Sequence, residues 1–179
     1  MKKLLLSLAV LAISASASFA DALMFTVNAT PYDKQMARIR PILENTGSSS
    51  NGASMGVVNA WMAELRDIPY GYALFWKTPS ETVSGAPADC KAKSVALYER
   101  MKAAGATNVR LVIGKRTPMS KMTHAWLAWE TEGGSYVLDP TFNYSATKSE
   151  KVGKRNYEPL YAYAGAKKFR AGSALVASN

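Results

Sequence analysis

The sequence contains a single cysteine, Cys90, and a single histidine, His124. An intramolecular disulfide is therefore impossible, and two residues fall short of the four Cys or His ligands that a structural zinc site usually has. A thiol and an imidazole are nevertheless the nucleophile and the general base of cysteine-dependent acyl chemistry. If the chain carries out such chemistry, it has to use this one pair.

Cys90 lies where a helix is expected to begin, after a loop that contains Gly85 and Pro87. The N-terminus of a helix has unpaired backbone N–H groups and the positive end of the helix dipole, and both stabilise a thiolate. A cysteine with only a packing role is more often found in the middle of a helix or strand. The position of Cys90 therefore favours a nucleophile.

His124 begins one predicted strand, and Asp139 ends the next strand of the same predicted hairpin. If Glu130 pairs with Ser135, the numbers of paired residues add up to about 265, so that His124 lies opposite residue 141 and diagonally from Asp139. Diagonal neighbours are about 7–8 Å apart, within reach of a carboxylate–imidazole hydrogen bond, but a slip of one residue would reverse the face. The spacing predicts a nucleophile, a base and a carboxylate that orients the base. The alternative is that His124 is a half-buried strand residue and that Asp139 only forms a turn before Pro140.

Two well-bounded helices are predicted. The first spans 55–68, where apolar residues recur at helical spacing, and it ends before Pro69. The second runs from near Asp89 to Gly105, since a glycine commonly follows the last helical residue. The other predicted segments are an extended stretch over 21–31, a helix over 32–45 interrupted at Pro41, and loops over 46–53 and 70–87.

The pattern changes to strands in the second half of the chain. Two of them are joined by residues 131–135, whose glycines favour a hairpin turn. Helices first and antiparallel strands afterwards predict an α+β fold, with the Cys90 helix packed on an antiparallel sheet. The strands are expected at 108–113, 124–130, 136–139 and 160–163.

The N-terminal segment has the features of a cleavable export signal. Lys2 and Lys3 precede an apolar run over 4–13, which is short of the roughly 20 residues that span a bilayer. Residues 18–20 fit the small-x-small cleavage rule, so we expect a mature chain that begins at Asp21 and is periplasmic or secreted. The alternative is an apolar first helix of the domain. The predicted organisation is a signal peptide at 1–20 and a single domain at 21–179.

Composition and charge narrow the classes of protein. The 179 residues include 48% hydrophobic residues, too many for a disordered chain, and the length suits one domain. Lys and Arg number 22 against 13 Asp and Glu, a formal net charge of +9. The positive charge favours acidic partners or anionic envelope surfaces. The alternative interpretation is that these basic residues only keep the protein soluble. No nucleic-acid recognition motif is found, so we expect no nucleic-acid partner.

Three motifs resemble those of the bacterial transglutaminase-like cysteine peptidases. Residues 76–83 (WKTPSETV), followed by the Ala-Asp-Cys of 88–90, resemble the segment before that family's nucleophile. Residues 123–126 (THAW) and 137–141 (VLDPT) resemble the His and Asp motifs of the wider transglutaminase-like superfamily. The motifs occur in the family's order, and the resemblance covers roughly residues 55–145.

This resemblance implies a papain-like fold and a Cys90–His124–Asp139 triad. Members hydrolyse amide bonds or transfer acyl groups, and some bacterial peptidases cleave surface adhesins in the periplasm. The implied substrate is therefore a protein or peptide, with cell-envelope proteins as candidates.

The chain departs from the family's pattern around the cysteine. Members commonly have Gly-Asp-Cys followed by acidic residues that contribute to calcium binding in the adhesin-cleaving peptidases. This chain has Ala88 before the Asp-Cys pair, and Lys91 and Lys93 after it. The departure argues against calcium, and we expect no cofactor. The two lysines are candidates for a change in substrate or regulation.

In the expected mechanism His124 takes the proton of Cys90, Asp139 fixes the imidazole ring, and the thiolate attacks an amide carbonyl. The backbone N–H of Cys90 and one further donor hold the oxyanion. The indole N–H of Trp76 is a candidate for that donor, and a core position for the ring is the alternative. Attack by water then gives hydrolysis, which we favour, while attack by a lysine amine gives cross-linking.

The competing hypothesis is a non-catalytic binding module that retains the fold and holds a partner on a basic, aromatic surface. Tyr157, Tyr161 and Tyr163 lie near the basic C-terminal part of the chain and are candidates for such a surface. Packing on the sheet is the interpretation we favour for these three rings.

Overall fold

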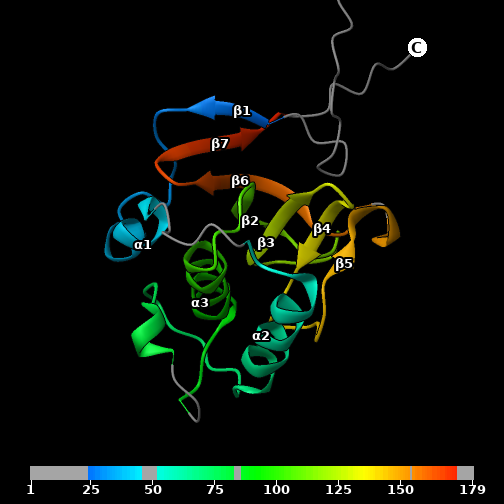
Figure 1. Cartoon of the computed structure of the whole chain (residues 1–179). Helices are drawn as coiled ribbons and strands as arrows, with labels where there is room; N and C mark the ends of the chain where they lie inside the picture. Colours follow the sequence, from blue (N-terminus) through cyan, green and yellow to red (C-terminus); the bar gives the residue numbers. More distant parts are fainter. Residues whose placement is uncertain (1–23, 46–51, 83–85, 154, 173–179) are drawn as a thin grey trace, which may run out of the picture.

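The computed structural model describes residues 24–45, 52–82, 86–153 and 155–172, so the expected signal peptide lies outside these ranges. Within them, seven strands form one sheet in the order β1-β7-β6-β2-β3-β4-β5, and every neighbouring pair is antiparallel (Figure 1). The strands are β1 (Met24–Val27), β2 (Val109–Lys115), β3 (His124–Thr131), β4 (Gly134–Leu138), β5 (Thr147–Lys148), β6 (Glu158–Ala164) and β7 (Lys167–Ala171).

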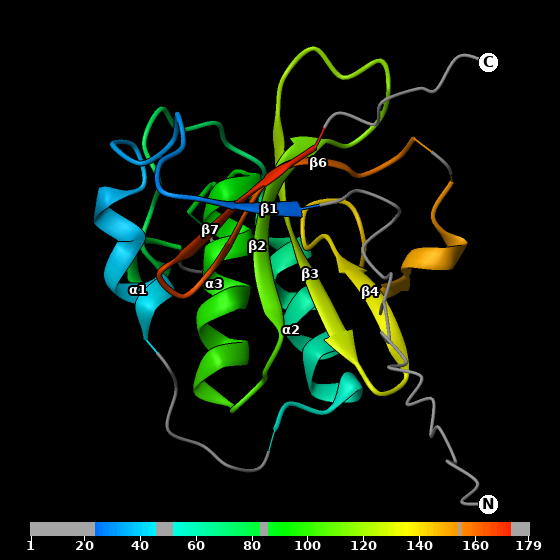
Figure 2. The same cartoon turned by 90° about the horizontal axis from the view of Figure 1, so that it is seen from above.

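The α-helices lie on one face of this sheet, as Figures 1 and 2 show from two directions. None of the helices in the described ranges is long and apolar enough to cross a membrane. The α-helices are α1 (Arg40–Glu44), α2 (Met55–Asp67) and α3 (Cys90–Ala103), and the short 3-10 helices are η1 (Ala37–Ile39), η2 (Pro79–Glu81) and η3 (Ser149–Lys151).

The helix α3 runs through the middle of the structure. Nine of its 14 residues are buried, so it is packed on several sides and its first residue is held in place. The larger apolar cluster joins α3 to α2 and to the near face of the sheet, and a smaller one covers the far face around Trp126. The helix ends where Gly105 takes a positive φ of 86°, a conformation that favours glycine.

The α+β arrangement, the two long helices and the four expected strands are confirmed, with shifts of one to two residues at several ends. Of the helix predicted over 32–45, only the second half is helical, as η1 and α1, and the predicted interruption at Pro41 is wrong. Pro41 lies in the first turn of the short helix α1, where its missing N–H costs no intrahelical bond. Strand β7, which we did not predict, is rich in basic residues, and it is held in the sheet by β1 on one side and β6 on the other.

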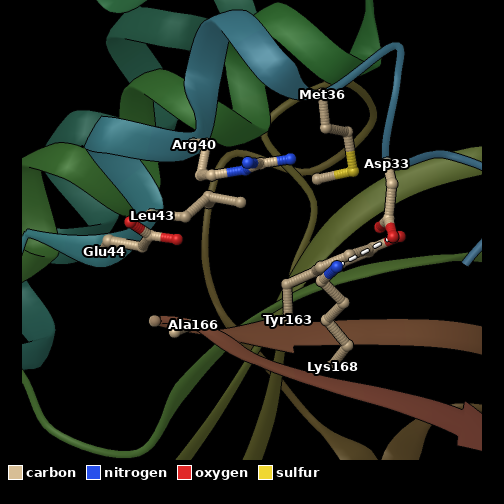
Figure 3. A pocket seen from close by; sticks show the side chains of 9 residues that line it. Asp33, Met36, Arg40, Leu43, Glu44, Tyr163, Ala166 and Lys168 are labelled. Carbon is tan, nitrogen blue, oxygen red and sulfur yellow. Dashed lines mark hydrogen bonds and ion pairs between the residues drawn. The ribbon is translucent and has the colours of Figure 1, made fainter. Parts of the chain in front are cut away.

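A small cavity of about 30 Å³ lies between the segment around α1 and strands β6 and β7. In Figure 3 the carboxylate of Asp33 faces the ammonium of Lys168, at a distance of 2.8 Å. Lys168 also donates to the carbonyl of Asn28 at 3.3 Å. A volume of this size holds about one water, so we interpret these contacts as a structural clamp between β7 and the turn that follows β1.

Candidate active site

Cys90 is the first residue of α3, as the sequence predicts, and it is 9% exposed. The helix is capped by Asp89, whose side chain accepts the backbone N–H of Ala92 at 3.1 Å. The chain before the cysteine is held by a neighbouring segment, because the backbone N–H of Gly71 donates to the carbonyl of Ala88 at 3.4 Å. The approach is so close that a Cβ on Gly71 would lie 2.3 Å from a side-chain carbon of Pro87.

His124 is the first residue of β3 and pairs with Gly114 of β2. Its ring is stacked on Trp126, with a centroid distance of 6.1 Å, and lies 5.4 Å from the ring of Phe142. Gly114 is required there, since a Cβ on it would lie 2.7 Å from Trp126 and 2.1 Å from a backbone oxygen. The imidazole is therefore held from two sides and is 9% exposed.

Asp139 follows β4 directly and is fully buried. Leu127 pairs with Leu138, and Glu130 with Ser135, so the register expected from the hairpin turn is confirmed. Oδ2 of Asp139 lies 2.8 Å from Nε2 of His124, and Oδ1 accepts the backbone N–H of Thr141 at 3.0 Å. The predicted carboxylate–imidazole contact is thus present in the structure.

The three predicted site residues come together. Burial disfavours the charged imidazolium, but the hydrogen bond to Asp139 and the proximity of Cys90 outweigh it and raise the pKa of His124 to about 9. Burial likewise opposes ionisation of Asp139, yet the hydrogen bond from His124 holds the pKa of that carboxyl below its usual range. Because Nε2 faces Asp139, Nδ1 is the ring nitrogen that remains available to another group. An imidazole held by a carboxylate near a thiol is the arrangement that cysteine-dependent acyl transfer uses, because the ring can take the proton of the thiol and leave a thiolate–imidazolium pair.

Tyr157 takes part in the site in a way that the sequence does not reveal. Its hydroxyl donates to Oδ2 of Asp139 at 2.8 Å, in addition to the packing of its ring on Trp126. Its φ of 54° is unusual for a non-glycine residue, and its backbone N–H donates to the carbonyl of Arg116 at 2.9 Å. A single tyrosine before a strand has no spacing signal that would connect it with Asp139.

Lys93 has its ammonium bound at the end of α2. Its side chain is almost fully buried, and its ammonium donates to the carbonyls of Ile68 at 2.6 Å and Arg66 at 3.3 Å, at the C-terminal end of α2. Burial lowers the pKa of Lys93. The residue satisfies the carbonyls of a helix end, so its expected role in substrate choice or regulation is not supported by its position.

Trp76 belongs to the same buried core cluster as Cys90 and is 1% exposed. Its indole nitrogen is buried and has no hydrogen-bond partner in the described part of the chain. A substrate could not reach this N–H in the present conformation. The structure therefore favours the core position over the oxyanion donor that the sequence left as a candidate.

Exposed apolar side chains come from the three loops that adjoin the three site residues. One loop precedes Cys90, one precedes His124 and one follows Asp139. The exposed residues in these loops are Tyr70, Tyr72, Leu74 and Phe75, then Met119 and Met122, then Phe142 and Tyr144. We call these eight residues the apolar rim.

Comparison with solved structures finds LapG of Legionella pneumophila, at 13% sequence identity. The EGTA-treated form gives a TM-score of 0.56 over 81% of this chain and 80% of that chain. The calcium-bound form, also at 13% identity, gives 0.54 over 84% and 87% of the two chains. The sequence matches no family model and no curated protein. The similarity shows the transglutaminase-like, papain-like fold and confirms the predicted fold class.

Proposed function

We propose that this protein is an exported cysteine-dependent amide hydrolase, a peptidase that uses a Cys90–His124–Asp139 triad on protein or peptide substrates. The observation that carries the proposal is the 2.8 Å contact between His124 and Asp139, beside the thiol that begins α3. The similarity in fold to LapG, a transglutaminase-like cysteine protease, supports the same class of reaction.

In this mechanism the imidazolium of His124 pairs with the thiolate of Cys90, and Asp139 holds the ring in place. The thiolate attacks the amide carbonyl, and the backbone N–H of Cys90 at the helix N-terminus stabilises the oxyanion. His124 then gives its proton to the leaving amine, which breaks the amide bond and leaves an acyl group on the sulfur. A water molecule, deprotonated by His124, releases the acid and regenerates the thiol.

The apolar rim supports a polypeptide as the substrate. Extended chains with large side chains bury apolar surface when they bind, and the rim presents such surface on the loops that adjoin the triad residues in the sequence. Phe142, whose ring lies 5.4 Å from that of His124, is also 4.2 Å from the guanidinium of Arg116. The combination of exposed rings and cations suits a substrate segment with apolar and acidic side chains.

The similarity to calcium-bound LapG raises the question of a calcium site in this chain. Calcium takes six to eight oxygen ligands. Asp89 is the acidic residue at the start of α3, but the ammonium of Lys91 already binds its Oδ2. Neither Lys91 nor Ala92 offers a carboxylate, and no group of three Cys, His, Asp or Glu side chains in the described ranges could hold a metal. These residues do not fit calcium, so we propose a peptidase that works without a metal cofactor.

Export is the second part of the proposal. Its support is the N-terminal sequence, with two lysines before an apolar run and small residues before Asp21. N-terminal sequencing of the protein recovered from the cell envelope or the medium tests it. A first residue of Asp21 is expected, whereas an intact Met1 in the cytoplasmic fraction would contradict export.

The peptidase is tested by comparing the envelope proteins of cells that express the wild type with those of cells that express Cys90→Ala. We expect protein fragments with new N-termini only in the wild type, and their masses identify hydrolysis because cross-linking would join chains instead. Identical protein profiles, together with unimpaired binding of a partner by Cys90→Ala, would favour the non-catalytic binding module.

A further inference from the structure

The carboxylate of Asp89 links the start of α3 to the loop that precedes it. Its Oδ1 accepts the backbone N–H of Ala92, as expected of an N-cap residue, at 3.1 Å. Its Oδ2 accepts the backbone N–H of Ala73, also at 3.1 Å. Because the side chain of Asp89 is only 2% exposed, its negative charge requires a nearby cation.

Lys91 provides that cation. Its ammonium donates to Oδ2 of Asp89 and, at 2.9 Å, to the backbone carbonyl of Ala73. It also lies 5.0 Å from the centre of the Tyr72 ring. Both polar backbone groups of Ala73 are therefore held, the N–H by Asp89 and the carbonyl by Lys91. The Lys91 side chain is 17% exposed, which sets it apart from a solvated surface lysine.

The loop that is held in this way borders the thiol. Burial and the proximity of Cys90 raise the pKa of Tyr70 from its ordinary value, so its phenol lies in the field of the site. Between Tyr70 and Ala73, the backbone of Gly71 bonds to Ala88, two residues before the cysteine. A displacement of Ala73 would therefore move the side of the site from which four residues of the apolar rim project.

We propose that Lys91 is a positioning residue whose ammonium is the resident cation of this site. It neutralises Asp89 and fixes the loop at Ala73, so the site needs no divalent cation. A calcium ion at Asp89 would compete with this ammonium for the carboxylate. The inference rests on the proposed function, because it takes the loop over 70–75 as a wall of the substrate site.

Amide hydrogen exchange at Ala73 in the full chain tests the contact without reference to catalysis. Lys91→Gln removes the charge, and Lys91→Arg keeps it. Lys102→Gln is the matched control, since Lys102 is on the same helix and its ammonium donates to the carbonyl of Ala106, at 3.2 Å, and not to Ala73. A charged hydrogen bond contributes enough that we expect about tenfold faster exchange at Ala73 in Lys91→Gln. We expect near wild-type exchange in Lys91→Arg and in the control.

Two further measurements connect the contact with the site. On a peptide cleaved by the wild type, Lys91→Gln is expected to raise KM about tenfold with a smaller effect on kcat, and Lys91→Arg to restore KM. The melting temperature and activity of the wild type are expected to be the same in EGTA and in calcium. Unchanged exchange at Ala73 in Lys91→Gln, or a wild type that calcium stabilises and EGTA inactivates, would overturn the proposal.

If Lys91→Gln fails to fold, the double variant Asp89→Asn/Lys91→Met removes both charges and is measured in its place. It is expected to lose the protection of Ala73, and retained protection would refute the role of Lys91. Failure of the proposed function is recognised separately. It would appear as an absence of cleavage and slow alkylation of Cys90 in the wild type, neither of which changes the exchange or melting results.

Discussion

Nε2 of His124 lies 2.8 Å from Oδ2 of Asp139, although the strand pairing that leads to this contact ends one residue before the aspartate. The same carboxylate oxygen accepts the hydroxyl of Tyr157 at 2.8 Å. Because Tyr157 holds the carboxylate and the carboxylate binds Nε2, the orientation of the imidazole ring is fixed. Nδ1 is therefore the ring nitrogen that the proposed mechanism pairs with Cys90, the first residue of α3, where a nucleophile can use the helix N-terminus.

The raised pKa of His124 predicts how stability changes with pH. The folded protein binds this proton more tightly than the unfolded chain, whose histidine pKa is near 6.5. The stabilisation is therefore fully present below about pH 6.5 and is lost as the pH rises through about 9. Urea unfolding over this range should show a falling free energy of unfolding in the wild type. His124→Gln should give a flatter dependence, and parallel curves would contradict the assigned pKa.

Asp139→Asn keeps the shape of the side chain but removes the charge that stabilises the imidazolium. We expect the pKa of His124 to fall and peptidase activity to drop by roughly 10²- to 10⁴-fold. NMR titration of the single histidine measures the pKa directly, without overlap from other imidazoles. If the titration midpoint is the same in both proteins, Asp139 is not the partner that raises it.

Tyr157→Phe removes one hydroxyl donor from Asp139 and keeps the ring that packs on Trp126. A hydrogen bond to a charged group contributes about 1.5–3 kcal/mol, so we expect a loss of that order in the free energy of unfolding. We also expect a reduced kcat, because Asp139 is held less firmly. Tyr161→Phe, in strand β6, is the matched control and should leave kcat unchanged. Equal effects of the two variants would argue against a special role for Tyr157.

Lys93→Met separates stability from activity. The substitution leaves the carbonyls of Ile68 and Arg66 without the ammonium that now bonds to both, at a cost of about 1–3 kcal/mol. Thermal unfolding should therefore shift to lower temperature, while kcat and KM measured well below the transition stay at wild-type values. A specific rise in KM would return Lys93 to the substrate site.

The hairpin could be predicted from the sequence because its turn residues set the register over a short distance. Pairing of Glu130 with Ser135 then places His124 and Asp139 near each other. Both ends of α3 could also be predicted. Asp89 is a residue type that caps the start of helices, and Gly105 follows the end of this one. These features depend on local chemistry alone.

Features that depend on contacts distant in sequence could not be predicted. The hydroxyl of Tyr157, a residue with a positive φ, donates to Asp139, from which it is 18 residues away in the sequence. Lys91 and Lys93 are two residues apart, yet one donates to the carbonyl of Ala73 and the other binds the end of α2. Their different roles follow from what α3 packs against on each side. Helical periodicity shows that Lys91 and Lys93 lie on different sides of α3, but it does not identify the segments that pack against each side.

The most direct test of the central claim is the rate at which iodoacetamide alkylates Cys90, measured from pH 5 to 10 in the wild type and in His124→Ala. Cys90 is the only cysteine, so the label reports on one thiol. The triad predicts rapid alkylation near neutral pH in the wild type, because the imidazolium stabilises the reactive thiolate, and much slower alkylation in His124→Ala. Equally slow alkylation of both proteins, with the folded state confirmed in each, would contradict the assignment of Cys90 and His124 as nucleophile and base.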